Sequence, residues 1–375
     1  MSENIFDLPD NLIYLNSAGQ GARLHAVNDA ARSALASSAR PWEGDMADWF
    51  GAVEHLRELA AATFGTEAEA LAYVPSASYG MAVAARNLPL AEGDTVVLLA
   101  GEYPSNRSVW QVAAEATGAR CIEVRPEAGE SWTDAVLRGI DPHTKVVSAP
   151  PCFWCDGAPL DLFAIRERAH AQGAALVVDA SQALGAVSMD LDALGADFVV
   201  CVGHKWLLGA HGLGWLWAAP RWRAQGEPIE QTWLARELRG DFNAIAQRLP
   251  PYRPGAARFD AGSSAHPLLT PIATAAMQQL HDWRIAEVEA ALGALTTHLH
   301  ARMEAAGMGA LMPNGHLPHL CAIRPPAEHL QAAANALREA GVVLSIRDGA
   351  LRVAPHRHVT TQQLDRVVEV LTAVL

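Results

Sequence analysis

Lysine is rare in this chain, and one of its two lysines lies in a motif that could do chemistry. Lys205 belongs to the segment 203–206, Gly-His-Lys-Trp, downstream of an apolar run that ends in Asp179. A lysine amine forms a Schiff base with a carbonyl cofactor, and it does so best where burial lowers its pKa. A carboxylate such as Asp179 keeps a pyridine nitrogen protonated, so that the ring accepts electrons from a breaking bond. The pair predicts pyridoxal phosphate as the cofactor.

A phosphate group needs free backbone N–H groups at the start of a helix, with hydroxyl groups close by. The segment 76–80, Ser-Ala-Ser-Tyr-Gly, stands between an expected strand and an expected helix. Ala77 and Ser78 are therefore candidates for the phosphate site. Helix capping without any ligand also selects serine at such a position, so both interpretations remain open.

An aromatic side chain can cover the face of a cofactor ring by offset stacking. Tyr103 lies on a loop after an expected strand and is our candidate for this position. Trp154 lies on a later loop and is a candidate neighbour of the ring, although ordinary packing explains a tryptophan equally well. A substrate carboxylate is best bound by a bidentate arginine, and Arg352 in an expected C-terminal strand is the candidate.

The Asp-x-x-Gln segment 179–182 and the His-Lys pair 204–205 together resemble the class V aminotransferases, pyridoxal phosphate enzymes of fold type I. The resemblance extends over nearly the whole chain. That family includes transaminases, cysteine desulfurases, kynureninases, C–S lyases and isopenicillin N epimerases. The resemblance implies that Gln182 contacts the ring hydroxyl and His204 the phosphate. Val202 stands where the family commonly has serine, so one phosphate contact is missing or comes from elsewhere.

The same resemblance implies further contacts. Gly262 and Ser263 resemble a segment that the family sends to the phosphate of the neighbouring subunit, which implies a homodimer with the active site at the subunit interface. Asn16 resembles part of the segment that lines the way to the substrate site. Arg352 would bind the carboxylate of an α-amino acid, and Arg347 would assist it or recognise a second anionic group.

The resemblance leaves the reaction open. Transamination is favoured because it is frequent in the family, while β-elimination by a C–S lyase and epimerisation are the alternatives. A cysteine desulfurase is disfavoured because the segment 345–351 has no cysteine where such enzymes carry their nucleophile. A non-catalytic ligand-binding module would not need to keep both Lys205 and Asp179.

Alternating apolar and amphipathic stretches from 66 to 216 predict an α/β fold with a mainly parallel sheet. Seven strands are expected, at 70–74, 95–99, 120–124, 145–149, 174–179, 197–201 and 214–218. One long helix is expected over 271–303, followed by a small C-terminal α/β domain. We therefore predict a large cofactor-binding domain over residues 1–264 and a small domain over 265–375. In such sheets, ligands bind at the carboxyl ends of the strands.

Composition excludes some function classes. The 375 residues include 50% hydrophobic and 18% charged residues, as in globular enzymes, and carry a formal net charge of −13. This charge argues against nucleic acid or an anionic membrane as the main partner. The N-terminus lacks the pattern of a signal peptide, so we expect a cytoplasmic protein. Five scattered cysteines suit no disulfide framework, and the lone pair at 152 and 155 predicts no metal site.

Overall fold

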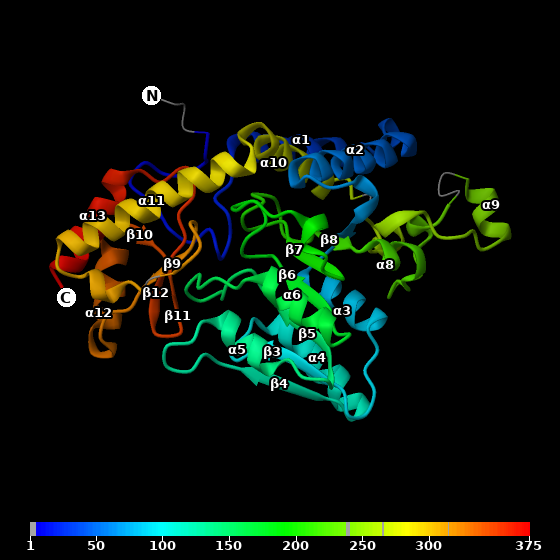
Figure 1. The fold of residues 1–375 in the computed structure, drawn as a ribbon. Helices are drawn as coiled ribbons and strands as arrows, with labels where there is room; N and C mark the ends of the chain where they lie inside the picture. Colours follow the sequence, from blue (N-terminus) through cyan, green and yellow to red (C-terminus); the bar gives the residue numbers. More distant parts are fainter. Residues whose placement is uncertain (1–4, 238–240, 265, 314) are drawn as a thin grey trace.

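A seven-stranded sheet forms the centre of the large domain (Figure 1). The structure, a computed structural model, describes residues 5–237, 241–264, 266–313 and 315–375. The strands are β2 (Leu71–Val74), β3 (Thr95–Leu99), β4 (Arg120–Val124), β5 (Thr144–Ala149), β6 (Ala175–Asp179), β7 (Phe198–Val202) and β8 (Gly214–Ala218), in the order β2-β8-β7-β6-β5-β3-β4. Only β8 runs antiparallel to its neighbours. The predicted α/β class with a mainly parallel sheet is confirmed.

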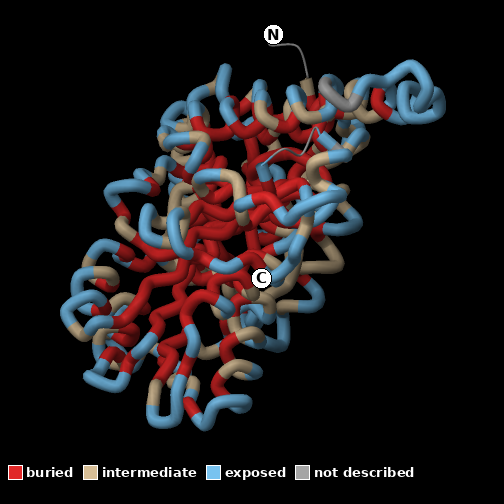
Figure 2. Tube along the Cα trace, turned by 90° about the vertical axis from the view of Figure 1, so that its right-hand side faces the viewer, coloured by how far each residue is buried: buried red, intermediate tan, exposed pale blue. Residues whose placement is uncertain are grey.

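Apart from the edge strand β4, both faces of this sheet are buried, which explains why its other strands are mostly apolar runs. Successive side chains point to opposite faces, so Val97 and Leu99 join one core while Val96 and Leu98 join another. Figure 2 shows the buried strands running through the middle of the molecule. The covering helices are α3 (Ala77–Asn87), α4 (Pro104–Thr117), α5 (Trp132–Gly139), α6 (Leu162–Ala171), α7 (Leu191–Leu194) and α8 (Pro220–Gln225).

Three further helices, distant in sequence, pack together beside the sheet. They are α1 (His25–Ser38), α2 (Met46–Phe64) and α10 (Leu269–Trp283), along the top of Figure 1. A short helix, α9 (Phe242–Gln247), lies at the far right of that view. Buried side chains of α10, such as Ile272 and Met277, belong to the same core as the sheet.

The C-terminal part forms a second core of its own. Its helices are α11 (Ile285–Ala305), α12 (Ala327–Glu339) and α13 (Thr361–Thr372), and its antiparallel sheet has the order β11 (Ser345–Arg347), β12 (Ala350–Val353), β9 (Cys321–Ile323). The N-terminal strand β1 (Ile13–Tyr14) pairs in parallel with β10 (Val342–Val343). The segment at 13–14 therefore crosses to the C-terminal part.

The prediction of one helix over 271–303 is wrong. Helix α10 ends at Trp283 and α11 begins at Ile285, because Arg284 between them has φ +61° and breaks the helical path. The buried side of α10 packs in the first core, and that of α11 in the second. The division of the chain at residue 264 stays a prediction.

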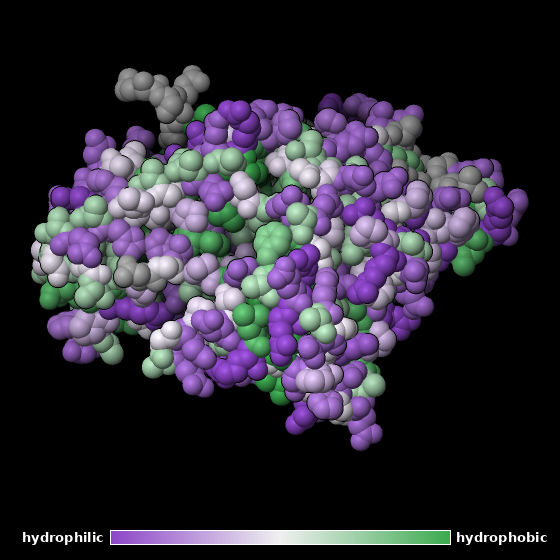
Figure 3. Space-filling view, in the orientation of Figure 1, coloured by the Kyte–Doolittle hydropathy of each residue, from purple (hydrophilic) through white to green (hydrophobic). Residues whose placement is uncertain are grey.

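The surface is predominantly polar. On the face in Figure 3, hydrophilic residues cover most of the outline, and hydrophobic ones gather toward the middle of the view. Within the described ranges, none of the helices combines the length and the apolar character that crossing a bilayer requires.

Candidate active site

Lys205 lies in a tight turn directly after β7. The turn depends on close backbone packing, because a Cβ on Gly203 would lie 2.3 Å from the Leu213 carbonyl oxygen. The N-terminal segment packs against it, since the Gly21 N–H donates to the His204 carbonyl at 2.9 Å. Lys205 is buried, and this burial lowers the pKa of its amine.

Asp179 ends the neighbouring strand β6, which pairs in parallel with β7. The carboxyl ends of both strands face the same edge of the sheet, so Asp179 and Lys205 meet there. Asp179 is buried, and its Oδ1 accepts a hydrogen bond from the Ser181 N–H at 3.0 Å. The carboxylate acts on Lys205 in the opposite sense to burial and raises its pKa.

Tyr103 and Trp154 connect this edge to the C-terminal domain. The Lys205 Nζ lies 5.1 Å from the centre of the Tyr103 ring. The Tyr103 and Trp154 rings meet edge to face, with their centres 5.6 Å apart. The Trp154 indole donates to the Gly101 carbonyl at 2.9 Å, which fixes the orientation of that ring.

Arg352 reaches the same cluster from β12. Its Nη1 donates to the Trp154 carbonyl at 3.0 Å, and its Nε donates to the Ser345 hydroxyl at 3.1 Å. The side chain is only 2% exposed, and burial lowers the pKa of the guanidinium to about 10. Asn16 lies beside this strand through a bridge to Ala354, and its Oδ1 is buried without a hydrogen-bond partner.

Two helices begin beside this edge of the sheet, at the candidate phosphate site. The N-cap of α3 is Ser76, which accepts from the Tyr79 N–H at 3.1 Å, so Ser78 is not the capping residue. Ala77 opens that helix, and the exposed Ser78 donates to the Ser105 hydroxyl in the first turn of α4 at 2.8 Å. The starts of α3 and α4 are thus joined. Helix starts with free N–H groups attract anions.

His204 and Gln182 have partners within the chain. The His204 ring stacks on His211, with ring centres 3.6 Å apart, and burial lowers the pKa of His204 to about 4. The Gln182 amide donates to the Ala18 carbonyl at 2.9 Å and accepts from the Trp206 indole at 3.0 Å. The implied contacts of both residues with the cofactor stay predictions.

Gly262 and Ser263 lie on an exposed loop after the buried Asp260. The Gly262 N–H donates to Glu230 at 2.6 Å, so that donor is already used within the chain. Ser263 has φ +62°, in the left-handed region. The hydrogen bonds and ring contacts of the described residues bring together Lys205, Tyr103, Trp154 and Arg352, but they do not connect the loop at 262–263 with them.

Residues 13–366 match the family model for aminotransferase class V. The chain belongs to the aminotransferase class-V family. A relative described as an uncharacterized aminotransferase, YcbU, of Bacillus subtilis is 26% identical over 85% of this chain and 83% of its own length. A kynureninase of Deinococcus radiodurans is 29% identical over 69% of this chain and 63% of its own length. An isopenicillin N epimerase of Streptomyces clavuligerus is 27% identical over 54% of this chain and 52% of its own length.

Solved structures show the same fold. A structure titled as a mutant of C-DES, with glycine covalently linked to the pyridoxal phosphate cofactor, covers 98% of this chain and 97% of its own, with a TM-score of 0.85 and 18% identity. The match to an apo cysteine desulfurase from Thermococcus onnurineus covers 100% of this chain and 98% of that protein, with a TM-score of 0.83 and 17% sequence identity. At these identities the likeness establishes fold type I.

Pyridoxal 5′-phosphate is the cofactor of this family, and this chain's residues fit it. A buried amine with a lowered pKa suits a Schiff base, and a buried carboxylate at the next strand end suits a pyridinium nitrogen. Tyr103 offers a ring face near the Lys205 amine. The joined starts of α3 and α4 offer N–H groups and two hydroxyls for a phosphate.

This member of the aminotransferase class-V family also buries a carboxyl group that sequence inspection missed. Glu102 is only 4% exposed, and its Oε1 accepts the Tyr103 N–H at 2.6 Å, while Oε2 faces Asn106 without hydrogen-bonding geometry. Burial, together with the Asp179 charge, raises the pKa of Glu102 to about 8. This shift favours the protonated, neutral form of the Glu102 carboxyl. The sequence does not reveal that Glu102 is buried, because its burial depends on the packing of α4.

Two buried cysteines near the site of this family member favour the thiol form over the thiolate. Cys152 and Cys155 are buried, and burial raises the pKa of both, to about 12 for Cys155. Thiolates, not thiols, are the nucleophilic form. Within the part of the chain that the structure describes, no group of three or more His, Cys, Asp or Glu side chains is arranged to hold a metal ion.

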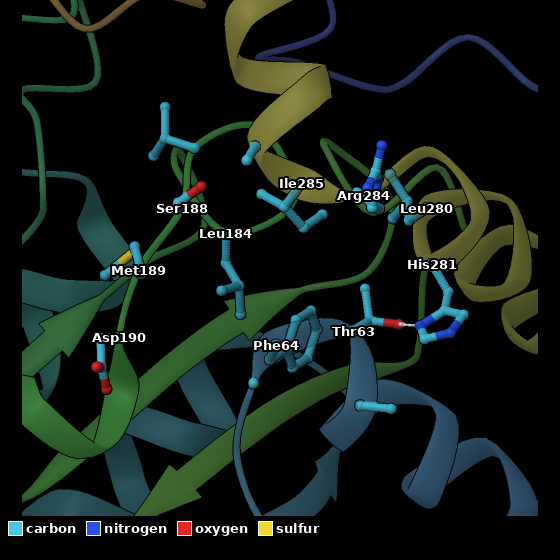
Figure 4. A pocket seen from close by; sticks show the side chains of 14 residues that line it. Thr63, Phe64, Leu184, Ser188, Met189, Asp190, Leu280, His281, Arg284 and Ile285 are labelled. Atoms are coloured by element: carbon cyan, nitrogen blue, oxygen red, sulfur yellow. Dashed lines mark hydrogen bonds between the residues drawn. The ribbon is translucent and has the colours of Figure 1, made fainter.

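A separate cavity of about 670 Å³ lies away from these residues (Figure 4). It is enclosed by the end of α2, the loop at 184–190 and the junction of α10 with α11. Leu184, Leu280 and Ile285 point into it, and His281 contacts Thr63 at its rim. None of the predicted site residues lines this cavity, so the volume of a cavity does not by itself identify the active site.

Proposed function

We propose that this chain is a pyridoxal phosphate-dependent aminotransferase acting on an α-amino acid. The observation that carries the proposal is the meeting of Lys205, Asp179, Tyr103 and Arg352 at one edge of the sheet, with no reactive thiol beside them. The Bacillus subtilis relative, whose match spans most of both chains, is described as an aminotransferase.

The roles follow from position and charge. When bound, the cofactor supplies a carbonyl carbon and an electron-accepting ring. Lys205 would be the base that takes the proton from the substrate α-carbon and delivers it to the former carbonyl carbon of the cofactor, and burial favours its neutral amine form. Asp179 holds a proton on the ring nitrogen. Arg352, whose Nε and Nη1 are occupied within the chain, offers Nη2 to the substrate carboxylate.

Cysteine desulfuration does not suit this site, because the sulfur acceptor has to be a thiolate. Cys152 and Cys155 are buried thiols of raised pKa, and the hairpin at 345–353 has no cysteine. A C–S lyase or an epimerase would use the same base and carboxylate clamp. These reactions differ from transamination in their products, so the product decides among them.

The experiment treats the holoenzyme with an amino acid, with and without a 2-oxo acid, and follows the visible spectrum. An aminotransferase accumulates the pyridoxamine form and recovers its starting spectrum when the 2-oxo acid is added. Release of ammonia with continuous turnover, or racemised amino acid, would overturn the proposal in favour of a lyase or an epimerase. Borohydride reduction and peptide mass spectrometry should find the cofactor on Lys205. Lys145→Ala, at the other lysine, is the matched control and keeps the activity.

A further inference from the structure

Two arginines project from one face of the β11–β12 hairpin. In the antiparallel register Ser345 is opposite Arg352, and Arg347 is opposite Ala350. Alternate residues of a strand share a face, and directly opposed residues share it too, so Arg347 and Arg352 are diagonal neighbours. The hydrogen bond from Arg352 to Ser345 agrees with this geometry.

That face of the hairpin is turned toward Trp154. The guanidinium carbons of Arg347 and Arg352 lie 5.8 and 5.9 Å from the centre of the Trp154 ring. These distances are within the range of cation–π attraction. Trp154 in turn meets Tyr103, beside the Lys205 amine. Both positive charges therefore belong to the active-site cluster.

The turn of the hairpin fixes where Arg347 stands. Asp348 and Gly349 have φ values of +46° and +70°, so both are in the left-handed region that two-residue hairpin turns of type I′ require. Such a turn sets the register of the two strands. Arg347 is therefore held beside Arg352 by the backbone, and not by a flexible loop.

Neither arginine forms an ion pair with any carboxylate of the described residues. Elsewhere the chain does pair a buried guanidinium, because Arg57 binds Asp260 at 2.7 Å. Of the acidic side chains around the two arginines, Asp156 is held by Arg324 at 2.8 Å, and Asp348, in the turn next to Arg347, forms no ion pair with the described residues. Among the described residues, Arg352 donates only to a hydroxyl and a carbonyl, and Arg347 only to the Ile346 carbonyl.

Two neighbouring unpaired positive charges, one of them buried, are costly without an anion. Arg347 adds to burial in lowering the pKa of Arg352, which reflects their mutual repulsion. One substrate carboxylate compensates one guanidinium and leaves the other unpaired. A substrate with two anionic groups compensates both.

We propose that the substrate is an α-amino acid with a second carboxylate on a short side chain, its α-carboxylate bound by Arg352 and its second carboxylate by Arg347. This inference rests on the proposed function, because it assumes that an amino acid occupies the site. Arg347 would then determine specificity through an ion pair that neutral amino acids cannot form.

The test titrates the holoenzyme with L-aspartate and L-glutamate and with their amides, L-asparagine and L-glutamine, following the shift in cofactor absorbance on binding. The wild-type protein should bind the acids at least about 10-fold more tightly than the amides. In Arg347→Gln this preference should fall below about 3-fold, through weaker binding of the acids alone. Arg347→Lys should keep part of the preference for the acids over the amides. Arg366→Gln, on the surface of α13, is the control and should match the wild type.

Equal affinities for acids and amides in the wild-type protein, or no response to either acid, would overturn the inference. Equal weakening of acids and amides in Arg347→Gln would also overturn it, because Arg347 would then serve the α-carboxylate. A second measurement needs no reaction: succinate should raise the melting temperature of the wild-type protein more than butyrate does, and Arg347→Gln should lose the difference. If the protein bound the acids more tightly than the amides but formed no pyridoxamine form of the cofactor, the aminotransferase proposal would be wrong and the inference of a dicarboxylic substrate would still hold.

Discussion

Glu102 shows how one buried residue can couple the site to pH. Its folded pKa of about 8 is raised from 4.5 by burial, and the unfolded chain has the lower value. Between these values the folded chain holds a proton that the unfolded chain has lost. Stability contributed by this neutral carboxyl is therefore complete below pH 4.5 and is lost as the pH rises toward 8.

We predict that Glu102→Gln flattens the pH dependence of stability on the alkaline side. The amide has nearly the same shape and no proton to lose, so the variant avoids a loss of at most about 1.4 kcal/mol per pH unit. The measurement is the melting temperature at pH 6 and at pH 8. The decrease in melting temperature between these two pH values should be smaller in Glu102→Gln than in the wild type. Glu115→Gln, exposed on α4, is the control. Equal decreases in Glu102→Gln and the wild type would show that the buried carboxyl does not keep its proton.

Individual chemical residues could be found from the sequence, but their surroundings could not. Lys205, Asp179 and Arg352 stand in recognisable motifs, and the structure places each near the others. His356 is fully buried with both ring nitrogens unpartnered, and burial lowers its pKa to about 3. Its burial, like that of Glu102, is created by segments distant in sequence, so local patterns do not reveal it.

At the scale of elements, strands were easier to predict than helices. Buried strands are short apolar runs between turns, so the bounds of β3 agree with the expected range 95–99, and those of the edge strand β4 agree with 120–124 although it is only partly buried. The break between α10 and α11 has no such mark, because Trp283, Arg284 and Ile285 include neither glycine nor proline. The sequence pattern is continuous there, but the helix is interrupted because α10 packs in one core and α11 in the other.

The packing of the N-terminal segment on the lysine turn gives a prediction at this scale. A Cβ on Gly21 would lie 2.3 Å from the Lys205 carbonyl oxygen, closer than any real contact, so the segment has to move. We expect Gly21→Ala to destabilise the protein by about 1–3 kcal/mol, as overpacking does, and to weaken cofactor binding. Denaturant unfolding and cofactor titration measure the two effects.

Gly51→Ala provides the matched control for that experiment. Gly51 lies within α2 with open space around its Cβ position, so the same substitution should stabilise the helix by about 0.5–1 kcal/mol. If both alanine variants behaved alike, the close contact of Gly21 with the lysine turn would not constrain the site.

At the scale of the whole molecule, the proposed active site lies where two cores meet. The sheet of the large core supplies Lys205 and Asp179, the C-terminal hairpin supplies Arg352, and the segment at 13–21 connects both parts. A change in the relative position of the two cores would therefore alter the distance between base and carboxylate clamp. The hydrogen bonds of the described residues connect the loop at 262–263 with Glu230 and not with this cluster, and its role toward a second copy of the chain stays a prediction.

We predict that two inactive variants restore activity when mixed. If Ser263 serves the phosphate of the neighbouring subunit, a Lys205→Ala subunit with normal Ser263 complements a Ser263→Asp subunit with normal Lys205. Aspartate tolerates the positive φ at this position and places a negative charge against the phosphate. The mixed dimer then has one complete site and one that lacks both groups.

The measurement is the activity of the two purified variants before and after subunit exchange, with light scattering to follow the dimer. Lys205→Ala alone should be inactive, Ser263→Asp alone should bind the cofactor weakly, and the mixture should exceed the sum of the two. Mixing Lys205→Ala with Ser33→Asp, exposed on α1, should give no more than the activity of the second variant. Absence of recovery in a mixed dimer would place Ser263 in the site of its own subunit, because a mixed dimer would then combine no complete set of groups.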